Sequence, residues 1–204
     1  MIAIINYGLG NINAFVNVYK KLGSELKIAR TADDLNGATK IILPGVGSFD
    51  QAMQRLNDSG MREALDNKVL NDKIPVLGIC VGMQMLALKS EEGLLPGLGW
   101  INGEVKKFVF PPDATTMRIP HMGWNTIKPL HSNGLLKGMD DKSRFYFLHS
   151  YYFKCFNSAD IISTTTYGIE FECAVTSGNI YGVQFHPEKS HGWGVELLRN
   201  FAEL

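Results

Sequence analysis

The chain lacks both a long apolar run and a leader-like N-terminus. Its 204 residues contain no hydrophobic stretch near 20 residues, the length that crosses a bilayer. Met1 leads almost directly into a strand-like segment, without the basic region, apolar stretch and small-residue cleavage site of a secretion signal. The sequence therefore predicts a cytoplasmic protein that does not act at a membrane.

Net charge is absent as well. Lysine plus arginine (20) balances aspartate plus glutamate (20), so the formal net charge is +0 at pH 7. Proteins that hold nucleic acid or an anionic membrane normally carry an excess of basic residues. We expect neither kind of partner.

Cysteine is scarce. Cys80, Cys155 and Cys173 are odd in number and widely spaced, which fits neither a disulfide framework nor a CxxC metal site. Among the five histidines, the strongest ligand-like spacing is that between His186 and His191, which is weak. We therefore predict at least one free thiol, no metal and no cofactor.

The length and pattern indicate one domain over residues 1–204. The chain is 45% hydrophobic, and a chain of this length can bury roughly 70% of its unfolded surface without a metal or disulfide. It shows no internal repeat, low-complexity tract or linker.

Strand and helix patterns alternate through the first half. Strand patterns occur at 2–5, 25–29, 40–43 and 74–79, and the continuous apolar runs among them indicate strands buried in a sheet. The helix pattern between Ile12 and Leu22 ends at Gly23, and Ser48 or Asp50 can start another helix. After the fourth strand we expect a helix that carries Met83, Met85, Leu86 and Leu88. This alternation predicts an α/β fold, a mostly parallel central sheet with helices on both faces.

The second half has a different pattern. Strand-like segments separated by turn residues occur at 103–108, 125–130, 144–153, 161–166, 171–175 and 180–185. We expect them to extend the sheet with antiparallel strands, and a final helix over 194–204 to cover one face.

Cys80 lies in the pattern Gly78 to Gly82 (GICVG), between a buried strand and a helix. This is the glycine-flanked nucleophile elbow, with cysteine where serine often stands. The sharp turn requires the glycines, because a Cβ would clash with a neighbouring strand or helix. The backbone N–H of Val81 then points beside the sulfur, where it can stabilise an oxyanion. The alternative is a packed structural cysteine.

A base for this thiol is available in the C-terminal part. His186 closes an apolar alternating strand, and Glu188 lies two residues on, facing the same way if the segment is extended. The carboxylate can then hold one ring nitrogen while the other takes the thiol proton. The alternatives are a hydrogen-bonded strand-end histidine and a solvated Glu188 paired with Lys189.

Motifs along the whole chain carry a resemblance to a known family. The stretches 44–47 (PGVG), 78–84 (GICVGMQ) and 186–188 (HPE) resemble those of class I, triad-type glutamine amidotransferases. More narrowly, 7–11, 120–125, 149–151 and 186–190 resemble the glutaminase subunit of imidazole glycerol phosphate synthase. Gly8 to Gly10 alone could instead form a dinucleotide-binding turn, but Asn13 replaces the third glycine of that motif.

The resemblance implies a flavodoxin-like fold and a triad of Cys80, His186 and Glu188 that hydrolyses glutamine through a thioester. It also implies an oxyanion hole and a glutamine-binding set. The oxyanion hole comprises Val81, Val46 and Gly47; the glutamine-binding residues are Gly47, Gln84, His149, Ser150 and Tyr151. Taken alone, Gln84 could be an exposed helix residue and His149 a core histidine.

The resemblance further implies a heterodimer. Ammonia would pass to a (β/α)8-barrel cyclase that completes the synthase of histidine biosynthesis. Asn11, Asn13, Trp124 and Lys189 stand at positions that resemble interface residues.

Three alternative functions remain open on the sequence. The first is a histidine-type glutaminase that serves an amino- or amidino-sugar synthase of surface-polysaccharide biosynthesis. The second is a stand-alone cysteine hydrolase of the same superfamily, and the third is a catalytically silent docking protein.

Overall fold

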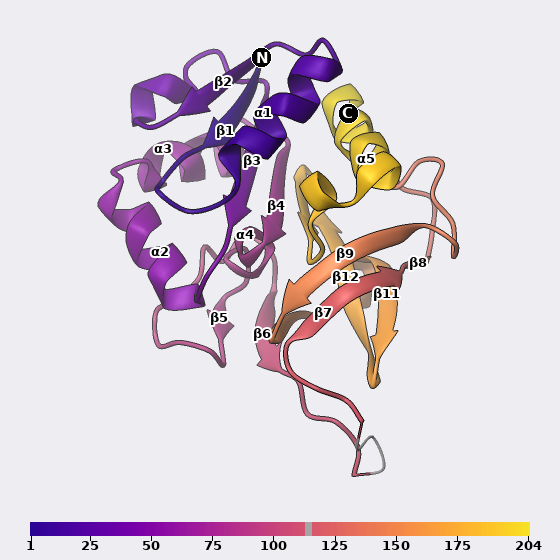
Figure 1. Cartoon of the computed structure of the whole chain (residues 1–204). Coiled ribbons are helices and arrows are strands. Elements are labelled where there is room, and N and C mark those ends of the chain that lie inside the picture. The colour runs from indigo at the N-terminus through magenta and orange to yellow at the C-terminus, as the bar shows by residue number, and fades with distance from the viewer. Residues whose placement is uncertain (113–115) are drawn as a thin grey trace.

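Parallel strands form one half of the main sheet. The computed structural model describes residues 1–112 and 116–204. The parallel strands, which include one from the C-terminal part, are β1 (Ile2–Ile5), β2 (Leu26–Ala29), β3 (Lys40–Gly45), β4 (Val76–Cys80) and β13 (Ile180–Val183). They run in the order β2-β1-β3-β4-β13, and every residue of β1 and β4 is buried (Figure 1). Burial on both faces explains the continuous apolar sequences of β1 and β4, whereas the edge strand β2 contains Lys27 and is only partly buried.

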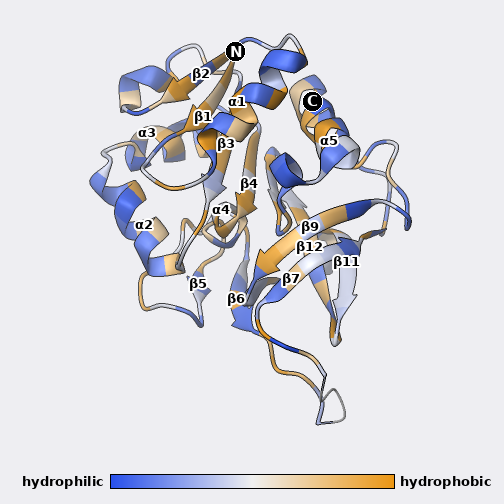
Figure 2. Cartoon of the chain, in the orientation of Figure 1, coloured by the Kyte–Doolittle hydropathy of each residue, from blue (hydrophilic) through white to orange (hydrophobic). Residues whose placement is uncertain are grey.

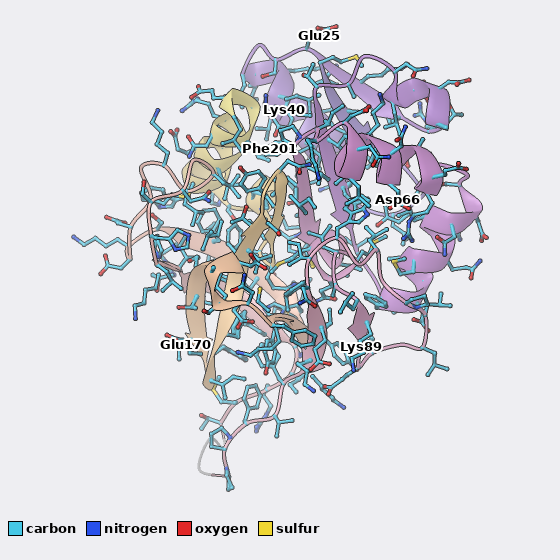
Figure 3. All side chains as sticks on the ribbon, turned by 180° about the vertical axis from the view of Figure 1, so that it is seen from behind. Glu25, Lys40, Asp66, Lys89, Glu170 and Phe201 are labelled. Atoms are coloured by element: carbon cyan, nitrogen blue, oxygen red, sulfur yellow. The ribbon has the colours of Figure 1, made fainter. Side chains whose placement is uncertain are left out.

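Helices cover both faces of these strands. They are α1 (Ile12–Lys21), α2 (Phe49–Asp58), α3 (Arg62–Asp66), α4 (Val81–Gln84) and α5 (His191–Glu203). α1 contacts α5 on the near side in Figure 1, whereas α3 is on the near side in the reversed view of Figure 3. α1 buries Phe15, Val16 and Tyr19, the stripe that its periodicity predicts, and Gly23 follows the helix with φ +70°. The predicted arrangement of helices is confirmed.

Antiparallel strands extend the sheet, as predicted. They are β6 (Gly103–Lys107), β8 (Lys128–Pro129), β10 (Tyr151–Cys155), β11 (Ile161–Tyr167) and β12 (Ile169–Ser177), with the short β5 (Lys89–Ser90) parallel to β6 at the edge. β13 pairs parallel with β4 on one side and antiparallel with β12 on the other. The sequence pattern predicts an antiparallel strand at 180–185. This is correct for the pairing of β13 with β12 but wrong for its pairing with β4, which is parallel.

A second, two-stranded sheet crosses the antiparallel half. β7 (His121–Thr126) and β9 (Arg144–His149) pair antiparallel, with His121 opposite His149. The predicted single strand 144–153 is therefore wrong: the chain leaves β9 at Ser150 and enters β10 of the main sheet. The predicted strand 125–130 is also divided, between β7 and β8.

Two helix predictions require correction. The helix after Cys80 ends at Gln84, so Met85, Leu86 and Leu88 lie beyond it. Backbone bonds from Leu98 to Met85 and from Ile101 to Leu86 hold that segment against the following loop instead. α5 begins at His191, three residues before the predicted start.

Hydropathy follows the layers (Figure 2). Orange, apolar residues concentrate on the central strands and on the inward sides of the helices, and blue residues lie on the outside. Within residues 1–112 and 116–204, no helix is long and apolar enough to span a bilayer.

Candidate active site

Cys80 stands at a sharp turn between β4 and α4. Its backbone has φ +55°, a conformation that non-glycine residues rarely adopt. A Cβ at Gly82 would lie 1.9 Å from the carbonyl oxygen of Leu43, and one at Gly78 would lie 2.6 Å from that of Gly82. Both glycines therefore permit β3, β4 and α4 to approach closely, as the elbow pattern predicts.

His186 follows β13, the strand beside β4. Its N–H donates to the carbonyl of Tyr146 in β9 at 2.9 Å, which fixes the backbone between two sheets. Its Nδ1 lies 2.9 Å from Oε1 of Glu188, and the two side chains are only 4% and 2% exposed. The predicted histidine–carboxylate pair is present in the structure, and Glu188 is not a solvated partner of Lys189.

The route to this pair differs from the prediction. Residues Pro187–Lys189 form a short 3-10 helix rather than an extended segment. This turn carries Glu188 back towards the ring, and Ser190 donates from its Oγ to the carbonyl of His186 at 2.6 Å. Glu188 Oε2 is buried and has no hydrogen-bond partner among the described residues.

The electrostatics of His186 favour a protonated ring. Burial lowers the pKa of His186, but hydrogen bonds and charge interactions with Cys80 and Glu188 raise it more, so the net pKa lies above its usual range. A proton that leaves Cys80 is therefore stabilised on His186, with Glu188 balancing the charge.

Two further groups contact the sulfur. The Sγ of Cys80 lies 3.8 Å from the carbonyl oxygen of Leu148, and Nε2 of Gln184 donates towards Sγ at 3.9 Å. Gln184 is fully buried and directly follows β13, two residues before His186. Gln184 is not predictable as a site residue, because an alternating sequence pattern does not reveal which inward-facing polar residue contacts the sulfur.

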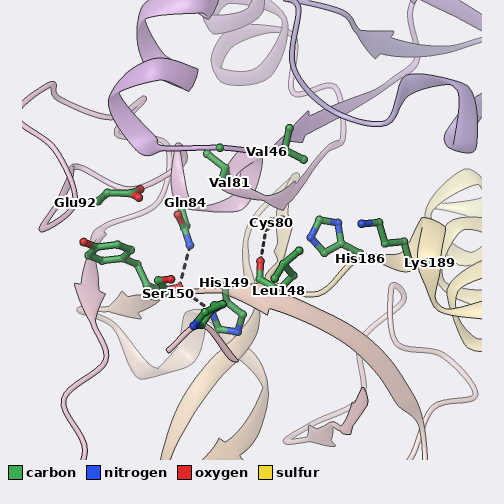
Figure 4. A pocket seen from close by; sticks show the side chains of 13 residues that line it. Val46, Cys80, Val81, Gln84, Glu92, Leu148, His149, Ser150, His186 and Lys189 are labelled. Atoms are coloured by element: carbon green, nitrogen blue, oxygen red, sulfur yellow. Dashed lines mark hydrogen bonds between the residues drawn. The ribbon is translucent and has the colours of Figure 1, made fainter. Parts of the chain in front are cut away.

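A cavity of about 290 Å³ opens over Cys80. Thirteen residues line it: Val46, Gly47, Cys80, Val81, Gln84, Glu92, Pro120, Leu148, His149, Ser150, Tyr151, His186 and Lys189. In Figure 4, Val81 and Gln84 face the segment with His149 and Ser150 across this space, with His186 beside Cys80. The structure thus brings together the predicted triad, oxyanion and glutamine-binding positions.

Gln84 and His149 are both engaged in hydrogen bonds within the protein. Gln84 is 3% exposed, so it is no exposed helix residue, and its Nε2 donates to the Tyr151 carbonyl at 3.0 Å and to Gln184 Oε1 at 3.1 Å. His149 bonds the same carbonyl through Nδ1 at 2.8 Å and His121 Nδ1 through Nε2 at 3.0 Å. Burial, the largest cause, lowers the pKa of His149 to about 3, so its ring is neutral.

Glu92 is a cavity residue that sequence analysis missed. Its Oε2 accepts the N–H of Phe49 at 2.8 Å, at the start of α2, and burial raises the pKa of the carboxyl. Glu92 lies in a loop with no motif of its own, so only the fold reveals its position at the cavity.

The predicted interface residues are exposed. Trp124 and Lys189 meet around Tyr146: the Trp124 ring lies 6.1 Å from it and Lys189 Nζ lies 5.7 Å from its centroid. Asn11 and Asn13 lie at the start of α1, which contacts the segment Pro187–Lys189. In the described part of the chain, no group of three or more His, Cys, Asp or Glu side chains could hold a metal ion.

This arrangement can activate a thiol towards an amide or ester carbon, with a histidine placed to transfer protons to and from the reacting groups. The fold and the site together define a cysteine-dependent hydrolase or acyl transferase of the α/β type.

Similarity to known proteins identifies the family within this class of enzymes. Residues 3–204 match the family described as "Glutamine amidotransferase class-I". The "Imidazole glycerol phosphate synthase subunit HisH" of Bdellovibrio bacteriovorus is 60% identical over 204 residues, covering 100% of both chains. The subunit of the same name from Leptospira borgpetersenii is 53% identical over the same length. The chain therefore belongs to the class I glutamine amidotransferases and, within them, to the HisH family.

Solved structures agree on the fold. One entitled "Crystal structure of glutamine amidotransferase" has a TM-score of 0.76 at 19% identity, covering 99% of this chain and 97% of that one. PurLQS from Thermotoga maritima gives a TM-score of 0.75 at 16% identity, with the same coverage.

Proposed function

We propose that this chain hydrolyses glutamine to glutamate and supplies the ammonia to the cyclase subunit of imidazole glycerol phosphate synthase. The observation that carries the proposal is the single cavity that holds Cys80 and His186, with Glu188 bonded to the far ring nitrogen at 2.9 Å. The full-length identity to HisH subunits supports the choice of substrate and pathway.

The triad performs two successive acyl transfers. Cys80 attacks the side-chain amide carbon of glutamine, and its proton passes to His186. His186 then protonates the departing nitrogen, and ammonia leaves with a glutamyl thioester on Cys80. Water, deprotonated by His186, attacks the thioester and releases glutamate.

Both tetrahedral intermediates carry an oxyanion. We propose that the N–H of Val81 stabilises it, which is worth roughly 3 kcal/mol for each well-aligned donor. The second donor is a backbone N–H of the loop at Val46 and Gly47. This loop supports that role because it lines the cavity, and Gly47 has φ +90°, which allows its peptide groups to reorient.

Glutamine binds between two walls of the cavity. Gly47, Gln84, His149, Ser150 and Tyr151 all line the cavity, and Gln84 faces His149 and Ser150 across it (Figure 4). Because both ring nitrogens of His149 are engaged within the protein, His149 acts through its backbone. Glu92 adds a carboxylate that suits the α-amino group of the substrate.

The partner docks on the exposed residues Asn11, Asn13, Trp124 and Lys189. We propose that this partner is a (β/α)8-barrel and that the two chains form a heterodimer. An exposed tryptophan beside a lysine and a tyrosine has the composition of an interface hot spot. We also propose a cytoplasmic location, because three unpaired cysteines suit a reducing compartment.

The test measures glutamate release from glutamine by the purified chain, alone and with a histidine-pathway cyclase plus its nucleotide ligand. We expect a slow rate alone and strong stimulation by the cyclase. Slow release under both conditions would contradict the pathway and favour a sugar synthase as the ammonia acceptor. Fast release by the chain alone would favour a stand-alone hydrolase.

A further inference from the structure

A buried hydrogen-bond chain reaches the glutamine-binding edge from β7. His121 and His149 are directly opposite residues of β7 and β9, and His121 Nδ1 lies 3.0 Å from His149 Nε2. His149 Nδ1 lies 2.8 Å from the Tyr151 carbonyl oxygen, and both side chains are almost fully buried. Neither histidine belongs to the catalytic triad.

The bond between His149 and the Tyr151 carbonyl fixes the donor and acceptor at every step of these hydrogen bonds. A carbonyl oxygen only accepts, so Nδ1 of His149 must carry the proton towards Tyr151. A neutral imidazole has one N–H, which leaves His149 Nε2 as an acceptor. His121 must then donate from Nδ1 and accept at Nε2, where the Asn125 amide lies at 3.5 Å.

The Tyr151 carbonyl joins this chain to the catalytic side of the cavity. It accepts both His149 Nδ1 and Gln84 Nε2, and Gln84 continues through Gln184 to the sulfur of Cys80. If His149 changed tautomer, two lone pairs would face each other across the 2.8 Å contact and the carbonyl would move. The position of the edge 149–151 therefore depends on the donor at His121.

Packing fixes the plane of the His121 ring. The ring is stacked between Phe147, at 4.7 Å between centroids, and Tyr167, at 4.0 Å. A residue needed only to fill this stack could be phenylalanine. A nitrogen donor aimed at His149 serves a further purpose.

We infer that His121 is a positioning residue for glutamine binding: its Nδ1–H fixes the tautomer of His149 and so places the backbone at Ser150 and Tyr151 for the substrate. This inference rests on the proposed function, because it takes glutamine as the ligand of the cavity.

Two substitutions separate hydrogen bonding from packing. His121→Phe keeps the aromatic stack and removes the donor. His121→Asn keeps a donor near the position of Nδ1 and removes the stack. His131→Phe, at an exposed loop residue, is the matched control.

The measurement is the glutamine concentration that protects Cys80 from iodoacetamide, which needs no partner protein. We expect His121→Phe to require about ten-fold more glutamine, the order expected when a buried acceptor loses its donor. His121→Asn should stay within about three-fold of the parent chain despite a larger loss of thermal stability. A purely structural role predicts the reverse order, with the less stable asparagine variant binding glutamine more weakly.

Nitrogen NMR of the imidazoles supplies an independent readout. We expect His149 to carry its proton on Nδ1 in the parent chain and in His121→Asn, and to lose that preference in His121→Phe. A parent His149 protonated on Nε2, or equal glutamine protection of the parent and His121→Phe, would overturn the inference. If glutamine protects no form of the chain while NMR shows the expected tautomers, the proposed function fails instead.

Discussion

Cys80, the proposed nucleophile, has a strained backbone. A positive φ at a non-glycine residue costs free energy, here held in place by β3, β4 and α4. The Cys80 side chain lines the cavity although the residue is only 3% exposed. Packing alone gives no reason for a cysteine in this conformation.

Replacing the nucleophile tests this role directly. We expect Cys80→Ser to lower glutamate release by about 10⁴-fold or more, because the hydroxyl lacks the nucleophilicity of the thiol. The melting temperature should change little, since the two side chains are similar in size. Cys155→Ser, at a buried thiol that lines no part of the cavity, is the control and should keep its turnover. Substantial glutamate release by Cys80→Ser would refute the triad.

In the proposed mechanism, Glu188 orients His186 and stabilises its charge, and it is not one of the residues that line the cavity. We expect Glu188→Gln to reduce turnover less than Cys80→Ser does, and to lower the pKa of His186, because the carboxylate is one of the groups that raise it. NMR titration of His186 together with kcat measures both effects. An unchanged rate and an unchanged pKa would mean that another group holds the ring.

The sequence identifies some site residues far better than others. Cys80, His186 and Glu188 are predictable because local rules constrain each of them: an elbow between glycines, and a carboxylate two residues from a histidine. Gln184, Glu92 and His121 are not predictable, because their roles depend on contacts between distant segments. Glu92, for example, bonds Phe49, 43 residues away in the chain.

At the scale of elements, close packing at the elbow limits which residues can follow β4. We expect Gly82→Ala to destabilise the protein by at least about 3 kcal/mol, since its Cβ would overlap backbone atoms that cannot rotate away. Gly192→Ala, in α5 with no atom within 4 Å of the added Cβ, should be neutral or stabilising by a few tenths of a kcal/mol. Denaturant unfolding measures both variants, and equal stabilities would contradict the packing argument.

The pairing of β7 with β9 makes stability depend on pH. Burial lowers the pKa of His121 to about 4 and is the main cause that lowers that of His149 to about 3, from 6.5. Below pH 6.5 the two imidazoles therefore become protonated in the unfolded chain while they are still neutral in the folded chain. With respect to these two groups, the free energy of unfolding is at its full value above pH 6.5 and falls as the pH drops towards 4.

We expect a loss of about 1–2 kcal/mol per imidazole between about pH 7 and pH 5. His186 has the opposite effect on stability. Because its pKa is raised in the folded chain, it contributes to the free energy of unfolding below pH 6.5, and this contribution is lost as the pH rises. Chemical denaturation at each pH measures the free energy of unfolding. Its slope against pH should be smaller in His121→Phe, because that variant lacks one of the two imidazoles. An equal slope in the parent chain and in His121→Phe would contradict a lowered pKa at His121.

The fold was predictable to different degrees in its two halves. Buried parallel strands are continuous apolar runs, so their sequences identify them without knowledge of their neighbours. The antiparallel strands are short and alternate, and their partners depend on distant segments. The division of 144–153 at Ser150 and the place of β13 beside β4 are consequences of that long-range pairing.

At the scale of the molecule, the cavity and the proposed docking surface lie on neighbouring elements. Trp124 projects outward from β7 and is 40% exposed, whereas His121 projects inward from the same strand. If the proposed partner contacts Trp124, it acts on the same strand whose His121 lies 3.0 Å from His149.

Loss of the tryptophan should affect the partner and not the substrate. We expect Trp124→Ala to weaken cyclase binding by about 10- to 100-fold, as for a central aromatic contact. Protection of Cys80 by glutamine should remain unchanged. Leu70→Ala, at a residue that is also 40% exposed, is the control. Titration of the cyclase against stimulated glutamate release gives the affinity, and equal affinities for the two variants would contradict the docking surface.

β13 also has a consequence for how the protein is made. It joins the parallel strands to the antiparallel strands, and it is the last of the named strands to be synthesised. While the chain is still on the ribosome, β4 and β12 have unpaired edges and no strand lies between them. The thiol is thus made long before its base, which arrives with the strand that closes the sheet. On the proposed mechanism, a nascent chain that lacks β13 carries the nucleophile without its base, and we expect it to release no ammonia from glutamine.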